Sequence, residues 1–135
     1  MKKILVVLSL FLLIATTVFA KQPKFKEATM IPQAAAPGDS VTLTVEFTGK
    51  IKEISKVFLT VREHPYDAPQ FILQPDKSQK KKNIWMLKTI VPWDAPSESV
   101  NLDITAIDKK GKEIVSKGLE NQATGKAGSV SFEIQ

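Results

Sequence analysis

The stretch EHPYDAPQF, at residues 63–71, gathers the rarest polar side chains of this 135-residue chain. The only histidine, His64, and the only tyrosine, Tyr66, lie two positions apart, and the carboxylates of Glu63 and Asp67 flank them. An imidazole next to carboxylates can act as a general base, a metal ligand or a binding group. Two prolines in the same stretch restrict the backbone, so the sequence predicts a shaped loop at the end of some regular element.

Catalysis or metal binding by this cluster finds little support in the rest of the chain. A Ser-His-Asp site would have to use His64, and no G-x-S-x-G motif is present. Zinc needs three or four ligands, and the chain offers one histidine and no cysteine. Glu63, His64 and Asp67 would converge on a metal only if the chain bends, because neighbours in an extended segment point to opposite faces. We therefore predict no catalytic residue, no metal site and no cofactor.

The first twenty residues have the layout of a secretory signal peptide. MKK is a positively charged start, ILVVLSLFLLIATT is an apolar run, and Val18 and Ala20 are the small residues expected before a cleavage after Ala20. A membrane anchor would need about 20 apolar residues, more than this run supplies. We therefore predict a signal peptide at 1–20, a single domain at 21–135 without a transmembrane segment, and export to the periplasm or the cell exterior.

Composition limits the partners of the exported domain. The leader takes Lys2 and Lys3 from the 19 basic residues, which leaves 17 against 14 acidic residues and a net charge of about +3. Only Arg62 is an arginine, whereas nucleic-acid readers favour arginine for two-pronged contacts. We predict no nucleic-acid partner. Because the chain has no cysteine, packing of the core alone must hold the fold.

A period of two dominates the chain from residue 40 onward. In SVTLTVEFT (40–48) apolar residues alternate with threonine and glutamate, which predicts a half-buried strand, and SVNLDITAID (99–108) and SVSFEIQ (129–135) repeat the pattern. The residues predicted to face the core are Val41, Leu43, Val45, Phe47, Val100, Leu102, Ile104, Ala106, Val130, Phe132 and Ile134. Less regular strands are predicted at 25–31, 56–62, 71–73 and 84–91.

Turn residues separate these strands. Asp108 to Gly111 predicts a tight hairpin in which Gly111 takes a positive φ, and the lysine-rich DKSQKKKN (76–83) predicts a solvated hairpin tip. No segment after the leader carries the 3.6-residue apolar period of a helix. Seven or eight short strands with such turns indicate an all-β fold, an antiparallel immunoglobulin-like β-sandwich.

Three segments carry a family resemblance: PGDSVTLTVEF, the PWDAP that precedes SVNLDITAIDKKGKEI, and the closing GSVSFEI. With them, most of residues 30–135 resembles bacterial immunoglobulin-like or fibronectin-III-like sandwich domains. The chain departs from the antibody type because it lacks the paired cysteines and the cysteine–tryptophan spacing. The resemblance implies a fold and no particular activity.

Three residues are the candidates for binding: His64, Tyr66 and Trp93. Trp93 lies between two prolines in PWDAP, where it either plugs the end of the core or forms an exposed platform for a sugar ring or a peptide side chain. Tyr66 either covers the edge of the core or takes part in recognition by the loop. Trp85, within a predicted strand, is expected to pack in the core.

These observations favour a secreted, non-enzymatic binding module that recognises a protein or polysaccharide partner through its end loops or by strand addition at a sheet edge. One alternative is a structural subunit of an envelope or surface assembly. Another is a small metal-binding or hydrolytic protein centred on His64. We also expect a small sandwich to lack the deep cleft that catalysis by paired carboxylates would need.

Overall fold

The computed structural model describes residues 22–79, 81–114 and 129–135. The predicted leader at 1–20 lies outside these residues. The described part forms nine strands and one 3-10 helix: β1 (Phe25–Ile31), β2 (Ala34–Ala35), β3 (Ser40–Phe47), η1 (Ile51–Glu53), β4 (Ile54–Val61), β5 (Phe71–Ile72), β6 (Gln74–Pro75), β7 (Asn83–Ile90), β8 (Glu98–Asp108) and β9 (Ser129–Ile134).

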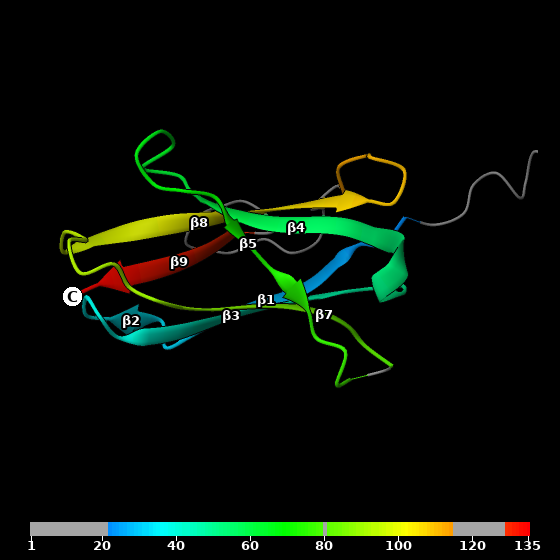
Figure 1. Cartoon of the computed structure of the whole chain (residues 1–135), viewed down its shortest axis with the longest axis horizontal. Coiled ribbons are helices and arrows are strands. Elements are labelled where there is room, and N and C mark those ends of the chain that lie inside the picture. The colour runs from blue at the N-terminus through cyan, green and yellow to red at the C-terminus, as the bar shows by residue number, and fades with distance from the viewer. Residues whose placement is uncertain (1–21, 80, 115–128) are drawn as a thin grey trace, which may run out of the picture.

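The strands form two sheets that face each other (Figure 1). One sheet has the order β1-β3-β7-β6 and the other the order β2-β9-β8-β4-β5. The predicted all-β sandwich is therefore confirmed. Its strand pairs are antiparallel, as predicted, except for the short edge pair β2–β9, which is parallel.

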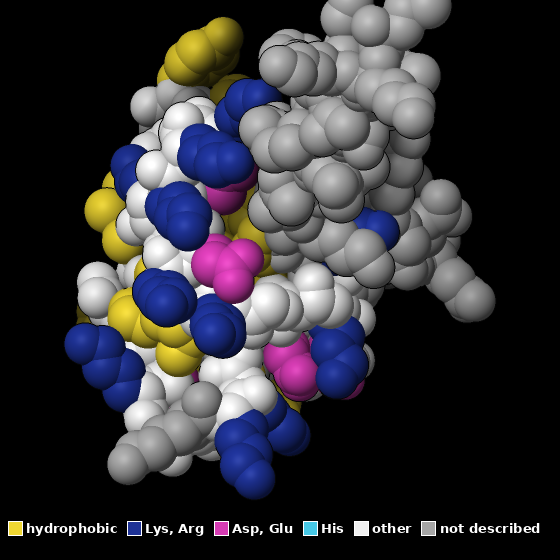
Figure 2. All heavy atoms as spheres, turned by 90° about the vertical axis from the view of Figure 1, so that its right-hand side faces the viewer, with side chains coloured by type: hydrophobic (Ala, Val, Ile, Leu, Met, Phe, Trp, Pro, Cys, Tyr) yellow, Lys and Arg dark blue, Asp and Glu magenta, His cyan; other side chains and the backbone are white. Residues whose placement is uncertain are grey.

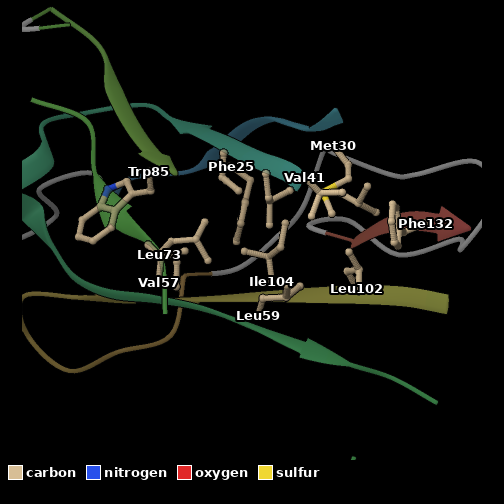
Figure 3. Close-up of a cluster of buried hydrophobic side chains, with 14 of the residues drawn as sticks. Phe25, Met30, Val41, Val57, Leu59, Leu73, Trp85, Leu102, Ile104 and Phe132 are labelled. Atoms are coloured by element: carbon tan, nitrogen blue, oxygen red, sulfur yellow. The ribbon is translucent and has the colours of Figure 1, made fainter. Parts of the chain in front are cut away.

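The core lies between the sheets because each long strand buries one face of its two-residue alternation. In β3, Val41, Leu43, Val45 and Phe47 are buried, and the intervening residues are half-buried. The same alternation holds in β8 and in part of β4, where Val57 and Leu59 are buried. In Figure 3, Val41 of one sheet and Leu59 and Ile104 of the other point into the space between the sheets.

The first half of β7 is covered on both faces, in keeping with its apolar sequence. The consecutive residues Ile84 and Trp85 are both buried. The indole N–H of Trp85 donates a hydrogen bond of 3.0 Å to the Asn83 side chain, whose amide in turn donates to the Thr48 carbonyl. The second half differs, since Lys88 is exposed and Ile90 is half exposed.

One side of the sandwich is closed where the chain crosses from one sheet to the other. β5 pairs with Phe58 and Leu59 of β4, and β6 pairs with the start of β7 in the opposite sheet. Leu73, between β5 and β6, is only 1% exposed, and its N–H donates to the Val57 carbonyl. Among the described residues, the ends of β4 and β7 that follow these pairs have no further strand partner on this side. No strand therefore closes the space between the two sheets at that end.

The turn after β8 has the predicted geometry. Gly111 has a φ of 84°, and its N–H donates to the Asp108 carbonyl. The Asp108 carboxylate accepts from the backbone N–H groups of Lys112 and Lys110 and from the Gln22 side chain; the first of these bonds contributes most to lowering the pKa of Asp108. Within residues 22–79, 81–114 and 129–135, no helix is long and apolar enough to cross a membrane.

Candidate functional site

A cavity of about 510 Å³ lies between the two sheets at the end of the sandwich where β4 and β7 end and β8 begins. Its inner wall is built from buried core residues of both sheets, among them Met30, Val41, Leu59, Leu102 and Phe132. The expectation that this small sandwich lacks a deep cleft is therefore wrong. The physical reason is local: the sheet-crossing segment closes the sandwich only at the other half of β7, where Trp85 fills the interior.

Two loops form the rim of the cavity. Residues 62–70 connect β4 to β5, and residues 91–97 connect β7 to β8. The first contributes Ala68 and Pro69 to the lining, and the second contributes Pro92, Ala95 and Pro96. Prolines hold both loops in extended or turn conformations, so the rim is stiffer than loops of ordinary composition.

The 62–70 loop is held against β8 by polar contacts from consecutive residues. The Arg62 guanidinium donates two hydrogen bonds to the Asp103 carboxylate, at 2.6 and 3.0 Å. The Glu63 carboxylate accepts from the backbone N–H and the side-chain amide of Asn101. Hydrogen bonding to Asp103 raises the pKa of Arg62, and the bonds from Asn101 lower the pKa of Glu63 against an opposing effect of burial. Both side chains therefore favour their charged forms, and both hold the loop to β8.

His64 continues this row at the edge of the cavity. Its Nε2 contacts the Glu98 carboxylate at the start of β8, and its Nδ1 lies 3.1 Å from the Asp67 carboxylate in its own loop. The bond with Glu98, followed by the bond with Asp67, raises the pKa of His64, and the bond with His64 lowers the pKa of Asp67. A protonated imidazole can donate to both carboxylates at once, so the loop is fastened most firmly when His64 is charged.

We predict that the His64 contacts are strongest between about pH 4 and pH 6.5. A raised pKa in the folded state gives stability that is present below the unfolded value of about 6.5 and is lost as the pH rises through the folded pKa. The lowered pKa of Asp67 gives stability that is present above its unfolded value, near 3.9, and is lost as the pH falls through the folded value. Proton NMR of the single imidazole should show a titration midpoint above 6.5.

Glu98→Gln should lower this midpoint, and Glu133→Gln, an exposed carboxylate on β9, is the matched control that should leave it in place. A wild-type midpoint at or below 6.5, or equal midpoints in the two variants, would contradict the role of Glu98.

The two exposed candidates take different places on the same end of the molecule. Tyr66 is 99% exposed at the tip of its loop, so the interpretation that its ring covers the core edge is wrong. Trp93 is 78% exposed, so the interpretation as a core plug is wrong as well. Its ring rests against Gly38, where φ is 88° and a Cβ atom would lie 2.4 Å from the indole. Neither ring lines the cavity, whereas His64 does.

The trio considered for a metal does not come together. The Glu63 carboxylate turns to Asn101, and His64 lies between Asp67 and Glu98 with both ring nitrogens engaged. Among the residues that the structure describes, no three histidine, aspartate or glutamate side chains are arranged to hold a metal ion.

Several residues at the site escaped prediction from the sequence. Asp94 and Glu98 contribute carboxylates to the rim, and Thr89 and Ile90 line the wall formed by the end of β7. The one visible signal was the run IWMLKTIV, whose inward positions change from Trp85 to the smaller Leu87 and Thr89. A decrease in side-chain size along an inward face leaves room that neighbouring strands must fill.

Comparison with known proteins supplies a fold and no sequence family. No protein-family model matches the chain, and no curated protein matches it. The structure is similar to the crystal structure of a Niemann-Pick type C2 protein from the Japanese carpenter ant, with a TM-score of 0.50 and 10% sequence identity. The match covers 86% of this chain and 95% of that one. The likeness shows the fold alone: an immunoglobulin-related β-sandwich similar to that of the Niemann-Pick type C2 protein.

Proposed function

We propose that this protein is a non-enzymatic binding protein that holds an apolar or amphiphilic small molecule in the cavity between its sheets. The cavity carries the proposal: its volume of about 510 Å³ lies within the usual range for ligand pockets, roughly 300 to 1,000 Å³, and most of its lining is apolar. The same proposal includes export as a single domain after removal of residues 1–20. A protein that encloses an apolar molecule lets that molecule pass through an aqueous compartment in which it dissolves poorly.

The chemistry of the lining supports binding over catalysis. Most of the lining consists of aliphatic side chains, a methionine and phenylalanines, and the one uncharged polar side chain among the described lining residues is Thr89. The charged side chains lie at the rim, where His64 is paired with two carboxylates. An elongated apolar molecule could place its tail between the sheets and its polar end at this rim. Burial of the tail would supply affinity at about 25 cal/mol per Å² of apolar surface removed from water.

The direct test is a fluorescence titration with N-phenyl-1-naphthylamine, an uncharged apolar reporter. We expect saturable binding of one molecule per chain with a dissociation constant in the micromolar range, which corresponds to about −8 kcal/mol. The reporter is excited directly, so the two tryptophans do not interfere. Absence of saturable binding by the folded protein would overturn the proposal.

A second candidate is a protein or polysaccharide partner that contacts the exposed rings of Tyr66 and Trp93. Exposed aromatic rings on end loops favour it, because such rings supply large contact area at a low cost in side-chain entropy. The double variant Tyr66→Ala, Trp93→Ala separates the two candidates. It removes both rings and leaves the residues that line the cavity unchanged, so reporter binding should persist while a macromolecular partner would be lost.

A further inference from the structure

Three carboxylates surround the mouth of the cavity, and each comes from a different element. Asp67 belongs to the 62–70 loop, Asp94 to the 91–97 loop, and Glu98 to the first residue of β8. Among the described residues that line the cavity, one can carry a positive charge, His64, and it already contacts Asp67 and Glu98. Within this described lining, at least two of the three negative charges are therefore uncompensated, whichever form the imidazole takes.

No lysine or arginine is among the described residues that line the cavity. Arg62 lies in the rim loop, but its guanidinium is engaged in the two-pronged bond to Asp103. Lys88 lies between lining residues of β7 and, with its exposed side chain, faces the outside of the sheet. A carboxylate carried into this mouth would meet like charge, and both ring nitrogens of the one possible cation in the described lining, His64, already contact Asp67 and Glu98.

The acidic mouth contrasts with the chain as a whole, which has a net charge of +5, or about +3 without the lysines of the predicted leader. Figure 2 looks at the opposite end of the sandwich, where Lys and Arg side chains are scattered over the surface. The exposed lysines of the turns at that end are Lys50, Lys52, Lys77, Lys81, Lys82, Lys109, Lys110 and Lys112. The closed end thus carries many lysines with some acidic side chains among them, whereas no lysine or arginine is among the described residues that line the open end.

We propose that the cavity selects its ligand by head-group charge: it takes a single-chain amphiphile with a cationic head and discriminates against the matching carboxylate. This inference rests on the proposed function, because it assigns the tail to the apolar cavity and the head to the mouth. A cationic head would lie among Asp67, Asp94 and Glu98 and gain their attraction. A carboxylate head would lose water and be repelled by all three, and it would have to compete with Asp67 and Glu98 for the ring nitrogens of His64.

The test displaces N-phenyl-1-naphthylamine with three ligands that share one tail: dodecylamine, dodecanol and dodecanoate, each below its micelle concentration at pH 7.5. At this pH an alkylamine is protonated and an alkyl carboxylate is ionised, by analogy with lysine near 10.4 and glutamate near 4.3. We expect dodecylamine to bind at least about tenfold more tightly than dodecanoate, with dodecanol between them. The difference should shrink as salt is added, because the mouth is open to solvent.

Asp94→Lys should narrow or reverse the preference, since it replaces a rim carboxylate with an ammonium group. Glu27→Lys makes the same change of charge on an exposed residue of β1, outside the lining, and is the matched control that should leave the preference unchanged.

Equal or tighter binding of dodecanoate than of dodecylamine by the wild-type protein would overturn the inference, as would equal effects of the two variants on that preference. If the reporter binds but none of the three ligands displaces it, the inference also fails. Failure of the reporter itself to bind would instead remove the proposed function.

Discussion

Thr89→Trp should abolish or strongly weaken binding of the apolar reporter, by at least about 30-fold. Thr89 lines the cavity from β7, and its partner Val41 in β3 is 3% exposed, so the position faces the interior. An indole there would occupy the space of the ligand, and forcing both into one cavity costs roughly 2 kcal/mol or more. Because 1.4 kcal/mol corresponds to a factor of ten in the dissociation constant, a loss of this size follows. Fluorescence titration of the variant measures it.

Lys88→Trp is the matched control, because it introduces the same ring one position away on the outer face of the same strand. It should bind the reporter as the wild-type protein does. Thr89→Phe, with a smaller ring, keeps the test informative if the larger ring disturbs folding. Unchanged reporter binding by Thr89→Trp, in a protein that melts within a few degrees of the wild type, would show that the ligand does not use this cavity.

Phe47→Ala should destabilise the fold by about 3 to 5 kcal/mol, the usual cost of removing a buried phenylalanine side chain. Phe47 is 2% exposed at the end of β3, and its ring centroid lies 4.7 Å from that of Phe25 in β1. The loss is a large part of the 5 to 15 kcal/mol that holds a typical domain folded, and no disulfide offsets it because the chain has no cysteine. Chemical denaturation, with the free energy of unfolding extrapolated to water, gives the value.

Phe58→Ala serves as the control, because it removes the same kind of side chain from the outer surface of the opposite sheet. Phe58 is half-buried on β4, where the Lys56 ammonium lies 5.0 Å from its ring centroid. We expect a cost of about 1 kcal/mol, in keeping with the small effects of surface substitutions. Comparable losses in the two variants would contradict the assignment of Phe47 to the core and of Phe58 to the outer face.

The sandwich itself was predictable because local alternation decides which face of a strand is buried. Val41, Leu43, Val45 and Phe47 repeat every second residue, and a period of two is compatible with one inward face and no other. The sequence did not indicate the short edge strand β2, which pairs with β9 in parallel. Two alanines carry no periodicity, so nothing in their sequence indicated a partner about 100 positions away.

The candidate site was predictable only in part. His64 and Asp67 lie three positions apart, so their contact follows from a turn between them. The contact of His64 with Glu98 spans 34 positions and exists because β4 pairs with β8 in the observed register. Exposure of Tyr66 and Trp93 was likewise undecided, since an aromatic ring in a loop packs inward or outward according to what lies beneath it.

The amino-acid sequence by itself determined the long strands, their inward faces, the turn at Gly111 and a fold that must do without disulfides. Each of these depends on residues a few positions apart, whose steric preferences act within the local chain. The tertiary structure alone decided the cavity and its acidic mouth. A cavity is the difference between the space that two sheets enclose and the volume of the side chains that fill it, and that difference depends on strands that are far apart in the sequence.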